Sequence, residues 1–310
     1  MSDPRYRGEV LAEVIRNNLV ESVHSGHLIE LAADGATVRS IGSMDIPIYP
    51  RSAVKALQAS AMVRAGLKLN PTQLAVVCAS HSGSEAHFEV IRSILSDYGL
   101  AERALLNALD KPIGEAERSN WGEKPATRIA QNCSGKHAGM LATCVVNGWD
   151  LLTYKEATHP LQLKIAQEFT LMSGEAPTHL TADGCGAPLF AMTILGLAKS
   201  IHALTVSNDP VHREVHTACL ANPVMIAGKG RLTTRLMQAV PGLFMKEGAE
   251  GVEVLSLSDG RTLAIKVTDG SWRPMGPIIT KTLKSWGINA PNESTLVYGG
   301  GEVVGEVRPS

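Results

Sequence analysis

The first part of the chain alternates apolar and polar residues, which is the period of a strand with one buried face. The alternation is clearest in Leu11-Ala-Glu-Val-Ile-Arg16 and in His27-Leu-Ile-Glu-Leu31, and Asp34-Gly35 lies between two runs of this kind. Asp-Gly at such a place is typical of a hairpin turn. We therefore predict antiparallel strands between Val10 and Gly42.

The period changes to three and four residues after Pro50. Val54, Leu57 and Ala61 show this spacing, which predicts a helix. The middle of the chain is interpreted in the same way. The elements predicted there are a helix over residues 51–67, a short buried segment over 76–80, a helix over 87–95 and a mostly helical stretch over 135–240.

Strand patterns return in the last part of the chain. Alternating runs over 251–257 and 262–267 flank the turn Asp259-Gly260. A helix over 278–286 and a closing strand over 294–298 follow.

Strands at both ends of the sequence with helices between them indicate the α+β fold class. We predict a single domain over residues 1–310, with one antiparallel sheet built from both termini and a helical region over about 51–240. No linker, repeat or low-complexity segment indicates a domain boundary.

Composition and charge exclude several classes of protein. Of the 310 residues 44% are hydrophobic and 19% are charged, and 29 Lys and Arg nearly balance 30 Asp and Glu, for a net charge of -1. Disorder and a basic nucleic-acid-binding surface are therefore disfavoured. The longest charge-free stretch, Leu69 to Ser84, is shorter than the roughly 18 apolar residues of a membrane span, and Met1 to Glu9 contains no apolar signal segment. We expect a cytoplasmic protein that binds neither membrane nor nucleic acid.

The cysteines and their polar neighbours indicate a metal site without fixing it. The five cysteines are too scattered for a disulfide framework. Two of them occur in Asn132-Cys133-Ser-Gly-Lys136-His137 and Asp183-Gly-Cys185-Gly186, which contain residue types that bind a borderline-soft metal. The Cys-x-x-Cys pair of a zinc finger is not present in the sequence. A metal site and two buried thiols both remain open on spacing alone.

Two serines and two lysines offer a nucleophile and a base. In Ser52-Ala-Val-Lys55, the spacing at the start of a helix places the hydroxyl and the amine on one face, so a neutral lysine can accept the serine proton. The same residues are also typical of a helix cap and its solvated end. Ser80 lies where an apolar run breaks into small polar residues before a helix, a corner that exposes hydroxyls to a pocket. Lys266, in a strand, either faces solvent or points into a cleft, where burial would lower its pKa.

Together these segments resemble the rhizobial-type L-asparaginases, the asparaginase II family of bacteria. The matching strings follow the family's order over about residues 18–270, and the one from Asn132 to Leu141 is highly specific. The resemblance implies a fold similar to that of serine β-lactamases, penicillin-binding proteins and their glutaminase relatives. It also implies hydrolysis of L-asparagine to L-aspartate and ammonia, and a homodimer. The strings are Arg51-Ser-Ala-Val-Lys55, Cys78-Ala-Ser-His-Ser-Gly83, Asn132-Cys-Ser-Gly-Lys-His-Ala-Gly-Met-Leu141, Asp183-Gly-Cys-Gly186, Gly230-Arg231 and Lys266-Val-Thr-Asp-Gly270.

The resemblance further implies a role for each site residue. Two serine–lysine pairs supply the nucleophile and the base, and two thiolates with a neutral lysine hold a zinc ion close to the substrate. An arginine binds the α-carboxylate of the amino acid, and a histidine and an aspartate orient the substrate or the metal ligands. The positions are Ser52 with Lys55 and Ser80 with Lys266 as catalytic pairs, Cys133, Lys136 and Cys185 as metal ligands, and Arg51, His137 and Asp183 as substrate-binding residues.

The expected reaction is amide hydrolysis through a serine acyl-enzyme. Ser52 has the Ser-x-x-Lys spacing of the β-lactamase fold and ranks first as the nucleophile, with Ser80 as its partner in proton relay or as the alternative nucleophile. The zinc ion is expected to position the substrate and act electrostatically. The alternatives are a glutaminase or another amide or β-lactam hydrolase on the same scaffold, and a non-catalytic zinc-binding protein.

Two departures from the family pattern concern the residues around the site. Ala56 stands where the family often has Pro, and we expect this change to be neutral because Pro there serves helix geometry. The segment Ala108-Leu-Asp-Lys-Pro112 contains no His or Cys, unlike relatives. If this segment lines the pocket, substrate preference or affinity would differ from the family norm.

Overall fold

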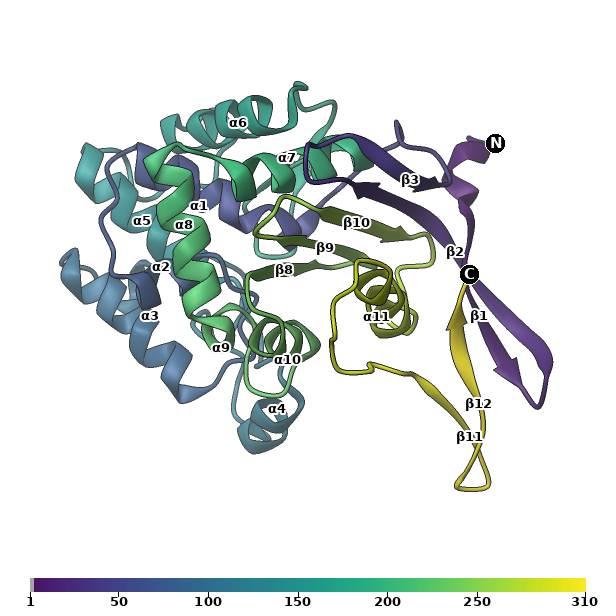
Figure 1. Ribbon diagram of the computed structural model, residues 1–310. Coiled ribbons are helices and arrows are strands. Elements are labelled where there is room, and N and C mark those ends of the chain that lie inside the picture. The colour runs from purple at the N-terminus through teal and green to yellow at the C-terminus, as the bar shows by residue number, and fades with distance from the viewer. Residues whose placement is uncertain (1–2) are drawn as a thin grey trace.

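The two ends of the chain meet in one antiparallel sheet of eight strands, shown in Figure 1. The computed structural model describes residues 3–310. The strands follow the order β11-β12-β1-β2-β10-β9-β8, and β3 also pairs with β2. The predicted α+β class, with a sheet assembled from both termini, is confirmed. The strands of this sheet are β1 (Glu9–Arg16), β2 (Leu19–Leu31), β3 (Thr37–Ile41), β8 (Leu243–Gly248), β9 (Val252–Leu257), β10 (Thr262–Val267), β11 (Leu296–Gly299) and β12 (Glu302–Pro309).

Helices fill the middle of the sequence, as the period of three and four residues predicts. The two short sheets among them pair β4 (Pro47–Ile48) with β7 (Met192–Thr193) and β5 (Leu180–Ala182) with β6 (Pro188–Phe190). The α-helices are α1 (Lys55–Arg64), α2 (Pro71–Val77), α3 (Glu85–Asp97), α4 (Glu115–Trp121), α5 (Ser134–Asn147), α6 (Pro160–Ser173), α7 (Ile194–Val206), α8 (Pro210–Ala221), α9 (Pro223–Ile226), α10 (Leu232–Ala239) and α11 (Met275–Ser285). The 3-10 helices are η1 (Pro4–Arg7), η2 (Arg51–Val54) and η3 (Glu102–Ala104).

The buried segment predicted over residues 76–80 begins in the last two residues of helix α2 and continues into the loop after it. The helix starts at a capping box, in which Asn70 and Gln73 each accept a hydrogen bond from the other's backbone, with Pro71 in the first turn. Helix α2 is buried continuously from Gln73 to Val77, so its last residues form an unbroken apolar run and do not show the spacing of three and four residues of a half-exposed helix. The loop that carries Ser80 begins directly after this helix.

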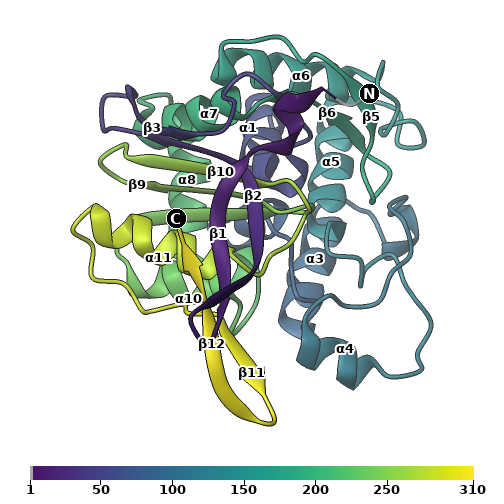
Figure 2. The ribbon, with the colours of Figure 1, turned by 90° about the vertical axis from the view of Figure 1, so that its right-hand side faces the viewer.

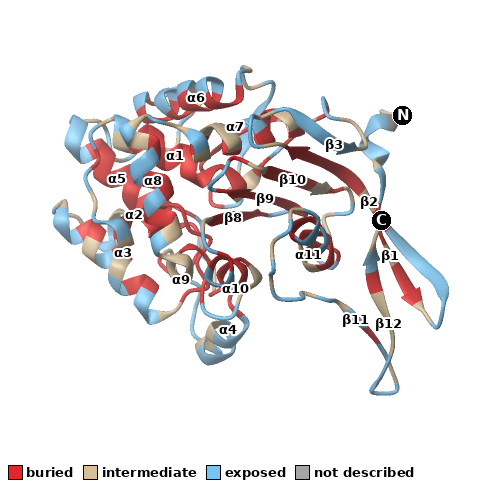
Figure 3. Ribbon diagram, viewed as in Figure 1, coloured by how far each residue is buried: buried red, intermediate tan, exposed pale blue. Residues whose placement is uncertain are grey.

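The edge of the sheet at β8 adjoins the helical body, and this arrangement positions the site. Helix α7 packs across β2, β9 and β10, and η2 packs against β8 and β9. Figure 3 shows that β8, β9 and β10 are largely buried, whereas much of the hairpins at the far end of the sheet is exposed. Residues from η2, from the loop after α2 and from β8 therefore meet in the interior.

The opposite end of the sheet projects from the body. We call the distal parts of the hairpins β1–β2 and β11–β12 the arm; it is visible in Figures 1 and 2. The β1–β2 turn consists of Asn17 and Asn18, whose φ values of 44 and 68 suit the left-handed turn of a two-residue hairpin. Among the described residues, no helix is both long and apolar enough to cross a membrane.

Candidate active site

Ser80 lies between two buried lysines. Its Oγ is 2.9 Å from the Nζ of Lys246 and 3.4 Å from the Nζ of Lys55. All three residues are at most 3% exposed. The Ser80 backbone amide donates to the carbonyl of Ile226 at 3.0 Å, which fixes the loop after α2 against helix α9. The arrangement is a hydroxyl with two amines in a nearly dry interior.

Lys246 has the properties of a base. Its Nζ also donates to the carbonyl of Glu247 at 2.8 Å. Burial, together with the positive charges of Lys55 and Arg231, lowers the pKa of Lys246 to about 8, against the opposing effect of nearby carboxylates. A fraction of this lysine is therefore neutral near neutral pH and can accept the proton of Ser80.

The predicted pairing of Ser80 with Lys266 is wrong. Lys266 lies in β10 opposite His27 of β2, and its Nζ donates to the carbonyls of Glu250 at 2.8 Å and Val267 at 2.5 Å. Two neighbouring strands separate β10 from the Ser80 loop, because β8 is the edge strand that faces this loop. The lysine that contacts Ser80 is Lys246, on β8.

Lys246 was missed because its sequence context, Leu243-Phe-Met-Lys-Glu-Gly248, is short and ends in adjacent opposite charges. Such a pair is usually solvated. The signal that was present is a lysine inside an apolar strand directly after the turn residue Gly242, where a strand buried on both faces begins.

The Ser52–Lys55 pair differs from the prediction in its contacts. Ser52 lies in η2, and Lys55 begins α1. The Lys55 amine donates to the carbonyl of Ala79 and to Ser80, and among the described residues neither it nor any other group hydrogen-bonds to the Ser52 hydroxyl. Ser52 is partly exposed. Ser52 thus remains accessible to a substrate, while Lys55 is turned toward the second serine.

Arg51 and Asp183 form an ion pair beside Ser52. The Nε of Arg51 donates to Asp183 at 2.8 Å, and their side chains are 23% and 9% exposed. Arg51 has φ of 53, a left-handed conformation that is costly for a residue with a side chain and is often found at functional sites. Burial would raise the pKa of Asp183, but Lys136 and Arg51 lower it to about 2. The carboxylate is therefore ionised throughout the neutral range.

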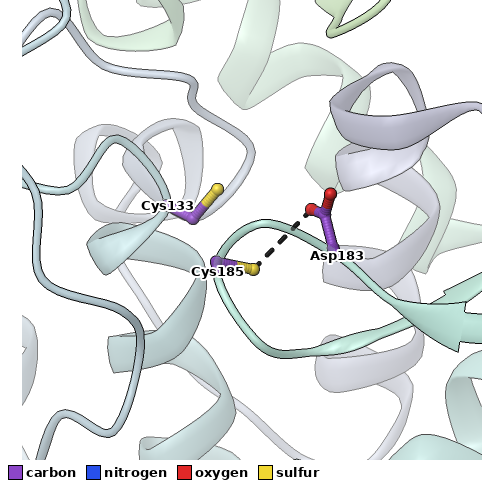
Figure 4. Close-up of side chains that lie close together, drawn as sticks. All are labelled: Cys133, Asp183 and Cys185. Carbon is purple, nitrogen blue, oxygen red and sulfur yellow. Dashed lines mark hydrogen bonds between the residues drawn. The ribbon is translucent and has the colours of Figure 1, made fainter.

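Two thiols and this carboxylate form a compact cluster, shown in Figure 4. One ligand atom from each of Cys133, Asp183 and Cys185 lies within 4.8 Å of the other two. Cys133 and Lys136 lie at the start of α5, and Cys185 lies in the turn between β5 and β6, so two segments far apart in the sequence converge. The Nζ of Lys136 is 3.3 Å from the Cys185 sulfur. The predicted grouping of Cys133, Lys136 and Cys185 is therefore present in the structure.

The charges within this cluster are strongly coupled. A hydrogen bond from Cys133, with the charge of Lys136, lowers the pKa of Cys185 to about 5, so Cys185 is a thiolate. The same hydrogen bond and burial raise the pKa of Cys133 to about 12. Burial opposes the charge of Lys136, but Cys185, Cys133 and Asp183 raise its pKa above the ordinary value.

This donor set fits a borderline-soft divalent metal. Two sulfurs and one carboxylate are close enough to share a cation, and one sulfur is already a thiolate. The residue types of the two strings admit Asp183 as a metal-binding residue, whereas the family resemblance gave it an orienting role. The structure places its carboxylate within reach as a ligand.

His137 and the 108–112 segment lie around this cluster. His137 is fully buried, and its Nδ1 is 2.6 Å from the Tyr154 hydroxyl. Burial and Lys136 hold the pKa of His137 well below the ordinary value, so its ring is neutral. The amide of Ala108 donates to the carbonyl of Cys185 at 3.2 Å, and Pro112 lies against the position of Gly83. The divergent segment thus packs against two loops that carry site residues.

Comparison with known proteins adds a family match over nearly the whole chain. The family model described as L-asparaginase II matches residues 12–309. No curated protein matches the chain. One solved structure, described as that of a candidate beta-lactamase from Bacteroides dorei DSM 17855, is 12% identical with a TM-score of 0.46, over 84% of this chain and 93% of that one. Another, described as Mglu in its native form in 4.3M NaCl, is 13% identical with a TM-score of 0.40, over 90% of this chain and 65% of that one.

Proposed function

This chain belongs to the L-asparaginase II family, which makes it an asparaginase-type amidohydrolase, and we propose that it converts L-asparagine and water to L-aspartate and ammonia. The observation that supports this proposal most is the Lys246 amine, fully buried, with its pKa lowered to about 8, at 2.9 Å from the Ser80 hydroxyl. A hydroxyl and a partly neutral amine at this distance are what a serine acyl transfer needs.

The first half of the reaction forms an ester. The Oγ of Ser52 attacks the side-chain carbonyl carbon of asparagine. Its proton passes to Lys55 as Lys55 gives a proton to the Ser80 hydroxyl, which passes its own proton to the neutral amine of Lys246. The carbon–nitrogen bond breaks as the lysine returns the proton to the leaving nitrogen, which departs as ammonia. We rank Ser52 first because it is partly exposed, whereas Ser80 is 3% exposed. Ser80 remains the alternative nucleophile.

The second half of the reaction restores the enzyme. Water attacks the ester carbon, a lysine takes the proton of the water, and the serine leaves with that proton to give aspartate. The oxyanion of each tetrahedral intermediate requires backbone N–H donors. The amide of Ser80 is already bound to the Ile226 carbonyl, and that of Ala53 to the Pro50 carbonyl, so we assign this role to the amide of Ser52 itself.

We assign zinc to the thiolate cluster. Cys133, Lys136 and Cys185 would hold it, with Asp183 as an adjacent carboxylate. When bound, the cation supplies positive charge beside the substrate and keeps both sulfurs deprotonated. Lys136 can act as a ligand only after loss of a proton, which the cation favours and the neighbouring thiolate opposes.

Substrate recognition is assigned to the partly exposed side of the site. Arg51 is paired with Asp183 and presents a guanidinium beside Ser52, which suits the α-carboxylate of an amino acid. Asp183 offers a carboxylate for the α-amino group. The neutral ring of His137 lies behind Lys136 and orients that part of α5.

We propose a homodimer that uses the outer face of the arm. Val20, Val23 and Leu296 are 40–46% exposed there. On the same face Glu13 lies opposite Arg308, so that face carries both charge signs and can pair with a second copy around a two-fold axis. Sedimentation of the wild type and of Val23→Lys tests this: a dimer that becomes a monomer supports it, and a wild-type monomer contradicts it.

A cytoplasmic location is proposed from the cysteines. All five are free thiols, and all five are buried. Proteins that keep several reduced thiols are typical of a reducing compartment.

Ammonia release from L-asparagine by the zinc-loaded enzyme tests the proposed activity. L-Glutamine and nitrocefin, assayed in parallel, separate the alternatives of a glutaminase and a β-lactam hydrolase on the same scaffold. We expect turnover of asparagine well above that of both. No ammonia from asparagine, with turnover of either other compound, would replace the proposal by that alternative.

A further inference from the structure

Arg231 bridges the two elements that carry Ser80 and Lys246. It precedes α10, and its Nη1 donates to the main-chain carbonyl of Ser80 at 3.0 Å. Its Nη2 forms an ion pair with Glu247, the residue that follows Lys246 in β8. The side chains of Arg231 and Glu247 are 27% and 11% exposed, so the pair is largely shielded from water.

The ion pair of Arg231 with Glu247 is held at several points. Glu247 is additionally held by the Thr233 hydroxyl at 3.3 Å. Ser80 itself contacts β8 through the hydrogen bond from Lys246, whereas its amide is directed to Ile226 of helix α9. A planar guanidinium that binds at two points transmits the position of β8 to the main chain of Ser80. The Gly230-Arg231 motif therefore contributes to the site through its contacts with the Ser80 carbonyl and Glu247.

We propose that Arg231, held by Glu247, is a positioning residue that fixes the Ser80 loop against β8 and so sets the contact between Ser80 and Lys246. This proposal rests on the proposed serine–lysine chemistry. It adds Arg231, which takes no part in the steps of that chemistry. Displacement of a reacting group by about 1 Å can cost roughly 100-fold in rate.

The same ion pair acts electrostatically on Lys246. The charged or titratable groups around the Lys246 amine are Lys55 on α1, Glu253 on β9, and the Arg231–Glu247 ion pair. The charge of Lys246 also acts on the thiol of Cys219 on α8. Glu253 is 1% exposed, and neither of its carboxyl oxygens has a partner among the described residues.

Glu253 is a neutral acid in this environment. It lies directly opposite Glu247 in the sheet, and burial together with that neighbour holds the pKa of Glu253 well above the ordinary value. With Glu253 neutral, Glu247 is the anion beside Lys246, and Lys55 and Arg231 are the cations. The cation of Arg231 lowers the pKa of Lys246, and the anion of Glu247 raises it.

Three substitutions separate position from charge. The pKa of Lys246 sets the acid limb, that is, the low-pH side of the pH dependence of kcat/KM. Arg231→Gln removes both the bridge and the cation. We therefore expect kcat to fall about 10- to 100-fold and the acid limb to move to higher pH. Glu247→Gln removes the anion, so kcat falls and the limb moves to lower pH. Arg231→Lys keeps the charge but cannot bind at both points, so kcat falls about tenfold while the limb stays in place.

Arg64→Gln is the matched control. Arg64 is an arginine whose side chain is 39% exposed and which pairs with the buried Glu168 at the far end of α1 from Lys55. We expect a comparable loss of stability, with unchanged kcat per folded enzyme and an unchanged acid limb. Equal kinetic effects of Arg64→Gln and Arg231→Gln, or shifts of the limb in the same direction for Arg231→Gln and Glu247→Gln, would overturn the proposal.

A measurement of the pKa of Lys246 needs no substrate, so its outcome does not depend on the proposed activity. The pKa of Lys246 can be followed by the Cε resonance of labelled lysine, assigned with Lys246→Met. The pKa of Lys246 should rise in Arg231→Gln, fall in Glu247→Gln and remain unchanged in Arg231→Lys. If asparagine is not a substrate but these shifts occur, only the proposed substrate fails; unmoved resonances would overturn the role of the pair.

Discussion

Lys136 and Lys246 are both completely buried, and their pKa values move in opposite directions. Burial disfavours the charged form of each. Around Lys246 the anion of Glu247 opposes burial, but the cations of Lys55 and Arg231 act with burial, and the pKa falls to about 8. Lys136 lies 3.3 Å from the Cys185 thiolate, and its pKa rises. Burial lowers the pKa of both lysines, and only around Lys136 do uniformly anionic neighbours reverse that effect, so Lys246 is the lysine that can act as a base.

The difference divides the site into two halves with separate tasks. In one half, Ser80 lies between Lys55 and Lys246, and the lowered pKa of Lys246 suits the proton transfer that we propose. The half built around Cys185 holds fixed charges, which suit a cation or an ionic part of a substrate. The charge of Lys55 acts on the Cys133 thiol, so the two halves adjoin.

The largest expected effect separates Lys246 from Lys266. Lys246→Met removes the amine at Ser80, and kcat/KM for asparagine should fall by about 1000-fold. Lys266→Met removes an amine that binds only the carbonyls of Glu250 and Val267, so we expect a change of less than about twofold. Steady-state kinetics of the two variants checks this. The opposite ranking would restore Lys266 as the partner of Ser80.

The corrected pairing shows what the sequence can and cannot predict. Alternation at both ends predicted strands, and the period of the middle predicted helices, because these patterns depend on local burial. Ser80 could be singled out because it follows an apolar run without a local capping role. The choice between Lys246 and Lys266 depends on the order β10-β9-β8, which is a long-range property of the sheet.

The thiolate cluster was predictable for a different reason. Its residues lie in two short strings, and each string forms a tight local structure, the start of α5 and the β5–β6 turn. The contact of Arg231 with the Ser80 carbonyl was beyond prediction, because it joins main-chain and side-chain atoms 151 residues apart. Hydrophobic patterning carries no information about such polar contacts.

Removal of the metal should have a smaller effect on activity. We expect chelation, or Cys185→Ser, to lower asparagine turnover by about 10- to 100-fold while the fold persists, because Cys133 and Cys185 are only two of the many buried side chains that form the core. Zinc content, turnover and thermal unfolding are measured on the same samples. Cys144→Ser, another buried thiol on α5, is the control and should keep its zinc. Unfolding on chelation would indicate a structural ion.

The smallest effect concerns stability rather than turnover. The pKa of Lys246 lies at about 8 in the folded chain, below its ordinary value of 10.5. Between these pH values the unfolded chain binds the proton and the folded chain does not, so this lysine makes the free energy of unfolding rise with pH, by up to about 3 kcal/mol. Urea unfolding of the wild type and Lys246→Met between pH 7 and pH 10.5 should show this rise only in the wild type. Parallel curves would mean that Lys246 is not perturbed.

Ammonia release from L-asparagine by Ser52→Ala and Ser80→Ala, beside wild type, tests the serine–lysine mechanism most directly. Ser60→Ala is the control, since its buried hydroxyl binds only the carbonyl of Ala56 within α1. We predict that each site variant loses about 1000-fold in turnover and that Ser60→Ala keeps it. Wild-type turnover in both Ser52→Ala and Ser80→Ala would contradict the mechanism.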